Sequence, residues 1–140
     1  MKKTYIRNIL ILAGIYYLSW WVVRPLFMIH DQVTSGMTYG GGLFGYLLMG
    51  IISVLPVALV AFGSGILTVY IVEETHLKYW LALLAMFYAV NGFSGFQWPK
   101  EPQLSDRAFQ VIHSLFPAMA CYFGGVVISK YHKQKKKEVT

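Results

Sequence analysis

The feature that most constrains this chain is an uncharged stretch of thirty-three residues from Gly40 to Val72. It contains no Asp, Glu, Lys, Arg, His, Asn or Gln. A helix needs about 20 apolar residues to cross the hydrocarbon core of a bilayer, which is about 30 Å thick. The stretch is longer than this, so it predicts a membrane-spanning helix preceded by a glycine-rich connection. Because the helix carries no charge, we expect it to act as a packing wall for its neighbours.

The composition extends this interpretation to the whole chain. Of its 140 residues, 56% are hydrophobic and only 13% are charged, whereas about a quarter of the residues in soluble domains are charged. Lipid can cover the apolar outer surface that water cannot. The predicted fold is therefore an all-α, polytopic membrane protein: one domain forming a bundle of four transmembrane helices in up-down-up-down order.

Apolar runs separated by polar segments define the four predicted spans. We expect Pro25 to end or kink the first span, and the polar residues 30–39 to form a loop. Thr75 is a candidate N-cap for the third helix, and Ser105 or Asp106 for the fourth. The predicted spans cover residues 6–29, 46–70, 79–96 and 108–129, within a membrane domain of residues 1–133 followed by a polar, basic tail of residues 134–140.

The distribution of basic residues predicts an orientation. Of the twelve Lys and Arg residues, nine fall on one predicted side and three, namely Arg24, Lys100 and Arg107, on the other. Loops rich in Lys and Arg stay in the cytoplasm. We therefore expect a multi-pass protein of the cytoplasmic (inner) membrane with both termini in the cytoplasm. The nine are Lys2, Lys3, Arg7, Lys78, Lys130, Lys133, Lys135, Lys136 and Lys137.

Polar residues inside the predicted spans are the main clue to function, because each must find a partner within the hydrocarbon. The orientation places four of them in the outer leaflet: Arg24, Asn91, Gln110 and His113. One hypothesis is a partly hydrated, outward-facing cavity that binds an anionic or polar ligand, with Tyr46 as a further candidate. The ordinary alternative is a set of interhelical hydrogen bonds, with Arg24 reaching the lipid headgroups.

Small residues on the second and fourth spans predict the closest helix contact. Small side chains at intervals of three or four residues let two backbones approach each other in a membrane. These residues are Gly63, Gly65, Ala118, Cys121 and Gly125.

Five lysines gather near the carboxyl end of the chain. A basic segment next to a span anchors the orientation and attracts anionic lipid. We expect these lysines to contact lipid headgroups at the cytoplasmic face, and we expect no nucleic-acid binding. They are Lys130, Lys133, Lys135, Lys136 and Lys137.

Motifs for chemistry are missing from the sequence. It contains no Ser/His/Asp arrangement, phosphate-binding glycine motif or clustered metal ligands, and no Asp or Glu lies within a predicted span. His30 and His113 are the pair that would suit haem, but only His113 is clearly inside the membrane. We therefore expect neither an enzyme nor a cofactor or metal site.

Two functional hypotheses remain. The first is a non-enzymatic accessory, regulatory or immunity-type subunit whose spans bind another membrane protein. The alternative is a small permease or flippase that uses the outward-facing cavity and forms a homo-oligomer, because four spans alone enclose little space.

Overall fold

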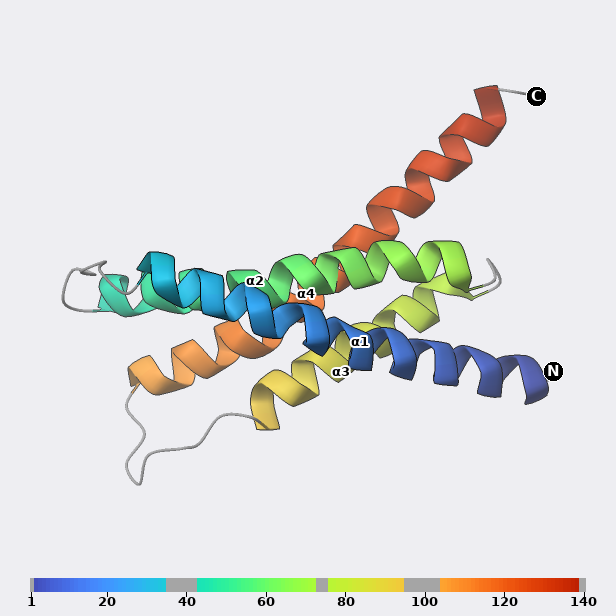
Figure 1. The fold of residues 1–140 in the computed structure, drawn as a ribbon. Coiled ribbons are helices and arrows are strands. Elements are labelled where there is room, and N and C mark those ends of the chain that lie inside the picture. Colours follow the sequence, from blue (N-terminus) through green and yellow to red (C-terminus); the bar gives the residue numbers. More distant parts are fainter. Residues whose placement is uncertain (1, 35–42, 73–75, 95–103, 139–140) are drawn as a thin grey trace.

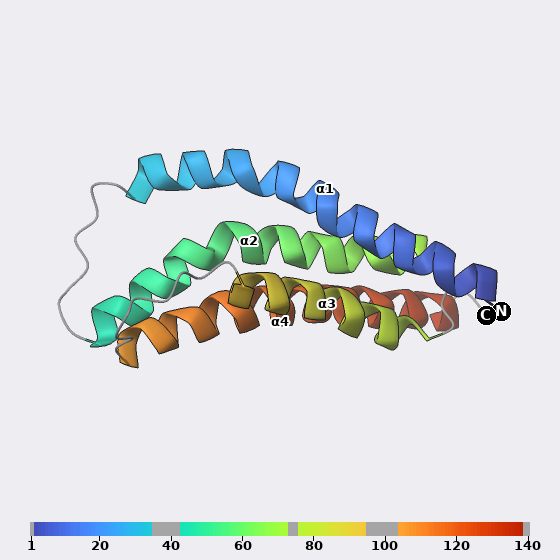
Figure 2. The same cartoon turned by 90° about the horizontal axis from the view of Figure 1, so that it is seen from below.

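The computed structural model describes residues 2–34, 43–72, 76–94 and 104–138. Every regular element in these ranges is an α-helix (Figure 1). The helices are α1 (Lys2–Thr34), α2 (Leu43–Ile71), α3 (Leu77–Ser94) and α4 (Leu104–Glu138). Consecutive helices run in opposite directions, as Figures 1 and 2 show.

Three segments of these helices are long and apolar enough to cross a membrane. They are Thr4–Thr34 in α1, Leu47–Ile71 in α2 and Arg107–Tyr131 in α4. Helix α3 is the shortest, with 18 residues, and its apolar run is flanked by Lys78 and Asn91. The expected spanning character is thus supported for three helices, and a crossing by α3 stays a prediction.

Helix α1 is longer than the sequence predicted. It continues through Pro25 to Thr34, so residues 30–34, expected in a loop, are helical. The hydroxyl of Thr34 donates to the carbonyl of His30, one turn earlier, at 2.9 Å. Pro25 does not end the helix, although α1 changes direction along its length in Figure 2.

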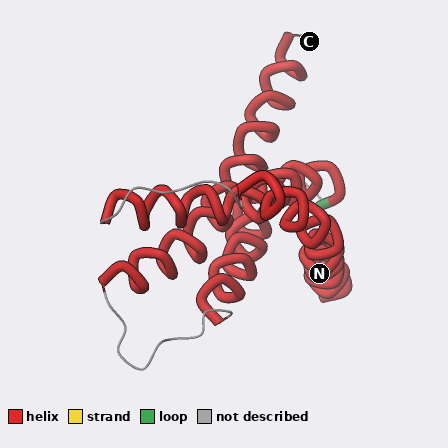
Figure 3. Tube along the Cα trace, turned by 60° about the vertical axis from the view of Figure 1, so that its left-hand side comes forward, coloured by secondary structure: helices red, strands yellow, loops and turns green. Residues whose placement is uncertain are grey.

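Helix α4 also differs from the prediction at both of its ends. It begins at Leu104, before the proposed caps Ser105 and Asp106, and it continues to Glu138 through most of the predicted tail. Lys, Gln and Glu are good helix formers, and extending an existing helix requires no new nucleus. The last part of α4 therefore stays helical and projects away from the other helices (Figures 1 and 3).

The residue just before α3 has an unusual backbone conformation. His76 has a positive φ of 68°, and its carbonyl accepts hydrogen bonds from the amides of Tyr79 at 2.9 Å and Trp80 at 3.3 Å. His76 therefore closes the first turn of α3, while the predicted cap Thr75 lies outside the described residues.

The most extensive helix contact is between α2 and α4. A Cβ on Gly65 would overlap the carbonyl oxygen of Cys121, and a Cβ on Gly124 would lie 2.5 Å from the carbonyl oxygen of Phe62. Both positions require glycine because backbone atoms, which adjust less readily than a side chain, occupy the space. The two helices thus meet backbone to backbone.

Most of the predicted packing residues lie at contacts between helices. Gly65 and the fully buried Cys121 lie at the α2–α4 contact, and Gly125 lies against the side chain of Leu81 in α3. Ala118 is half-buried. Gly63 departs from the expectation: a Cβ there would find no atom of the described chain within 4 Å, because the helical rotation turns it away from α4.

Helix α1 packs on α2 and α3, and less extensively. Its contact uses large side chains: the Tyr16 ring packs against Phe87 and Tyr88 with centroid separations of 5.8 Å and 5.1 Å. Leu12 and Leu84 are fully buried in the same cluster. The apolar core thus lies where α1 covers the α2–α3–α4 unit.

Candidate functional site

The site begins at a carbonyl that a proline leaves free. In an α-helix the carbonyl of Ile52 would accept from the amide of residue 56, but Pro56 has no amide hydrogen. Instead, the Nε2 atom of His30 in α1 lies 2.8 Å from this oxygen. Because a carbonyl only accepts, His30 is the donor and carries its hydrogen on Nε2. Pro56 therefore creates the acceptor that binds α1 to α2.

The next residue of α2 binds a second histidine. The Ser53 hydroxyl donates to the carbonyl of Gly50 at 3.0 Å and lies 2.8 Å from Nε2 of His113 in α4. Since the hydroxyl hydrogen is already used, His113 donates to Ser53. The His113 ring also stacks on Phe109, with centroids 4.3 Å apart.

The two histidines thus reach α2 from different helices and bind neighbouring residues. We call His30, Ile52, Ser53 and His113 the histidine clamp. It holds α1 and α4 to the same turn of α2, just before Pro56, and both of its hydrogen bonds are partly buried.

A second proline acts on the α4 side of the clamp. Pro117 lacks the amide hydrogen that would bond to the carbonyl of His113. Gly92 of α3 approaches this carbonyl so closely that a Cβ on Gly92 would lie 2.5 Å from its oxygen. Residue His113 therefore contacts α2 through its ring and α3 through its backbone.

Beside the clamp lies a cavity of about 190 Å³. Its lining comes from all four helices and is mainly aromatic and apolar. Tyr88, one of the lining residues, shares a buried hydrogen bond of 2.9 Å with Ser64 of α2. The lining residues are Trp20, Phe27, Val57, Tyr88, Asn91, Gly92 and His113.

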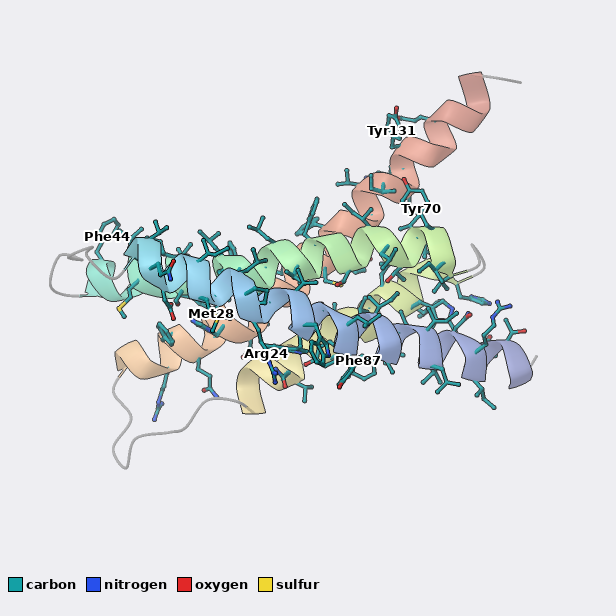
Figure 4. All side chains as sticks on the ribbon, in the orientation of Figure 1. Arg24, Met28, Phe44, Tyr70, Phe87 and Tyr131 are labelled. Atoms are coloured by element: carbon teal, nitrogen blue, oxygen red, sulfur yellow. The ribbon has the colours of Figure 1, made fainter. Side chains whose placement is uncertain are left out.

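The structure brings together only two of the four predicted ligand-binding residues. Asn91 and His113 line the central cavity. Gln110 is 2% exposed and lies one turn before His113, where its carbonyl accepts from Ser114 at 2.9 Å. Arg24 is exposed on α1 and is not part of the cavity lining (Figure 4). The side chain of Tyr46 lies outside the described residues.

The hydrogen bonds of His30 and His113 bear on whether these side chains could ligate haem or a metal ion. The Nε2 atoms of His30 and His113 are both engaged with α2, while Nδ1 of His30 lies 3.5 Å from a carboxylate oxygen of the exposed Asp31. Among the residues that the structure describes, no group of three His, Cys, Asp or Glu side chains could hold a metal ion.

Several members of the site were missed in the sequence. Ser53 lies in the uncharged stretch expected to be a passive wall, and His30 was assigned to a loop. The signal that could have found this turn is the position of Pro56, since a proline within a helix marks the carbonyl four residues earlier as an available acceptor.

Comparisons with known proteins add nothing to this geometry. No family model matches the chain, and no curated protein or solved structure is significantly similar to it. The proposals below therefore rest on the residues and their contacts.

Proposed function

We propose that this chain is a small integral protein of the cytoplasmic membrane that acts as a non-enzymatic accessory, regulatory or immunity-type subunit. In this proposal its helices recognise another membrane protein through their outward faces. The apolar character of α1, α2 and α4 supports the membrane location, because their exposed surfaces suit lipid better than water.

The observation that carries the proposal is how the polar side chains between the helices are used. His113 pairs with Ser53, Tyr88 with Ser64, and His30 with the carbonyl of Ile52. Each contact joins two helices, as hydrogen bonds commonly do inside membranes. These polar groups therefore support assembly of the bundle and leave its exterior as the surface for recognition.

Helix α1 offers the best surface for a partner. It is the least buried of the three long helices and contacts only α2 and α3 among the described elements. Leu18 and Trp21 lie on its outer side, each 63% exposed. Large aromatic side chains such as Trp are frequent anchors in protein interfaces.

Site-specific photocross-linking in native membranes tests this surface. A photoreactive residue at position 18 or 21 should yield one adduct of discrete mass with a different protein. The same residue at position 59, where Leu59 is similarly exposed on α2, is the matched control. The proposal fails if positions 18 and 21 cross-link no protein.

The alternative is a small permease or flippase. The central cavity supports it because Asn91 and His113 share a lining to which all four helices contribute. Its volume of about 190 Å³ and its aromatic lining suit a binding pocket better than a continuous polar path. An adduct formed only between copies of the 15.9 kDa chain would favour this alternative.

The proposed orientation has both termini in the cytoplasm. Cysteine labelling can test it because the single native cysteine, Cys121, is fully buried. A membrane-impermeant thiol reagent should label Ser35→Cys from the outside and Gln134→Cys only from the cytoplasmic side. Reaction of Ser35→Cys from the cytoplasmic side alone would overturn the orientation.

A further inference from the structure

A second cavity, of about 430 Å³, lies between the first turns of α3 and the carboxyl half of α4. Its polar lining includes Lys78 from α3 and both Ser129 and Lys130 from α4. Leu81 and Val126 contribute apolar walls. The cavity thus combines two cationic side chains and a hydroxyl with a hydrocarbon surface.

The two lysines come from helix ends that the fold brings together. Lys78 is the second residue of α3, and Lys130 lies one residue before the end of the apolar segment Arg107–Tyr131. Both side chains are exposed, so neither ammonium group is desolvated when no ligand is present. Their positions match the level at which a span meets the headgroup region.

The start of α3 adds donors to the same cavity. Leu77 and Lys78 are in its lining, and the amides of these first two helical residues have no acceptor within α3, whereas those of Tyr79 and Trp80 donate to the carbonyl of His76. His76 and Tyr79 complete the polar part of the lining. Amides at a helix start and lysine ammonium groups both favour a negatively charged group.

The cavity lies where α4 leaves the other helices. Beyond Lys130 the helix continues away from the bundle, as the position of Tyr131 in Figure 4 shows. The cavity lies at this end of the molecule, between the start of α3 and the residues of α4 just before Tyr131.

From this arrangement we propose that the cavity binds the phosphate of an anionic phospholipid headgroup. Lys78 and Lys130 contact the phosphate oxygens from two sides, and the hydroxyl of Ser129 donates a hydrogen bond. The acyl chains extend along Leu81 and Val126. A free phosphate ion would share the polar contacts but would leave these two apolar side chains without a counterpart, so the lipid is the better fit.

This inference rests on the membrane location in the proposed function and is independent of any protein partner. It is also more specific than attraction of lipid to the basic end of α4, because it requires one lysine from α3 and a space of defined shape. Lipid binding to the purified chain therefore tests it even if no partner exists.

The test is native mass spectrometry of the full chain in detergent, titrated with dioleoylphosphatidylglycerol. The first bound molecule of dioleoylphosphatidylglycerol should bind more tightly than later copies of the same lipid. It should also bind more tightly than dioleoylphosphatidylcholine. Replacing both lysines (Lys78→Gln with Lys130→Gln) should weaken this binding about tenfold or more, since one basic residue near anionic lipid contributes about 1 kcal/mol. The matched control, Lys135→Gln with Lys136→Gln, removes the same charge from the projecting end of α4 and should have a smaller effect.

A second variant tests the shape and leaves the charge unchanged. Ser129→Trp fills the cavity but keeps both lysines, and it should abolish the tight binding. Circular dichroism and a single symmetric elution peak establish that each variant is folded. The proposal is overturned if both lysine pairs weaken binding equally, if Ser129→Trp binds normally, or if phosphatidylcholine binds as tightly. Displacement of the lipid by inorganic phosphate at an equal concentration would identify the ligand as the free anion and reject the lipid.

Discussion

Helix α4 and helix α1 both pack against α2, but they do so by different means. The α2–α4 contact brings backbones together at Gly65 and Gly124. The contact of α1 uses bulky side chains, the Tyr16 ring against α3 and the His30 ring against the carbonyl of Ile52. One interface is therefore fixed by the shape of the backbones, whereas the other depends on side chains that can change rotamer.

This difference predicts separate roles for the two interfaces. A backbone contact has no flexible atoms that can move aside, so small changes there should prevent close approach. Side-chain contacts tolerate changes of volume better, and α1 leaves a broad apolar face uncovered. We infer that α2, α3 and α4 form the rigid part of the molecule and that α1 is the helix available for recognition.

The largest expected loss of stability comes from one added methyl group at the contact between α2 and α4. Gly65→Ala places a Cβ onto the carbonyl oxygen of Cys121 and close to the amide nitrogen of Gly125, 3.1 Å away. The helices must separate, which should lower the free energy of unfolding by about 3 kcal/mol. Unfolding by sodium dodecyl sulfate in mixed micelles, followed by tryptophan fluorescence, measures the loss.

Gly63→Ala is the matched control for this variant. It adds the same methyl group two residues away, where no atom of the described chain lies within 4 Å. Alanine favours the helix over glycine by about 0.5 to 1 kcal/mol, so stability should rise slightly. Equal destabilisation by the two variants would contradict the backbone contact between α2 and α4.

A somewhat smaller loss is expected where α3 meets α4. In Gly92→Ala the new Cβ would lie 2.5 Å from the His113 carbonyl oxygen and 2.8 Å from the Cα of Ser114. We expect the free energy of unfolding to fall by about 2 kcal/mol, less than for Gly65→Ala, because the overlap of the new Cβ with its nearest backbone atom is smaller at Gly92. The same mixed-micelle titration measures it.

Gly14→Ala in α1 serves as the comparison for Gly92→Ala. A Cβ at position 14 would meet nothing within 4 Å, so this variant should be neutral or slightly stabilising. If Gly92→Ala leaves the free energy of unfolding unchanged, α3 does not pack against the carbonyl of His113.

The general architecture was predictable because it follows from the length of the apolar runs. Four helices result from four such runs, and the three longest have enough apolar residues to cross a bilayer. The helix ends were less predictable. Residues 30–34 look polar enough for a loop, but they continue α1 to Thr34, where His30 bonds to the carbonyl of Ile52 in α2.

The candidate site was predictable only in part, for a geometrical reason. Spacing along the chain gives the depth of a residue in its helix; this reasoning placed Asn91 and His113 at one level, and both line the central cavity. The rotation of each helix about its axis depends on packing with its neighbours. This rotation turns Arg24 outward, and no periodicity within α1 alone would reveal it.

The bond between His113 and Ser53 should contribute much less than either glycine contact. Hydrogen bonds between helices within a membrane average about 0.6 kcal/mol in double-mutant cycles. We expect a coupling free energy of this size from Ser53→Ala, His113→Leu and the double variant. The cycle removes the separate effect of losing the His113 ring from its stack on Phe109, and a coupling near zero would show that the bond does not stabilise the bundle.

The smallest effect on stability is expected at the outer face of α1. Trp21→Ala and Leu18→Ala remove side chains that are exposed in the isolated chain, so each should change the free energy of unfolding by less than about 0.5 kcal/mol. Their effect should instead appear in binding of the partner. Trp21→Ala should remove the adduct formed by a photoreactive residue at position 18, and Leu18→Ala should remove the adduct formed by one at position 21. Leu59→Ala on α2 should change neither property. A large loss of stability in the α1 variants would mean that α1 belongs to the rigid unit, whereas unchanged stability with a lost adduct would establish that the loosely packed helix is the one used for recognition.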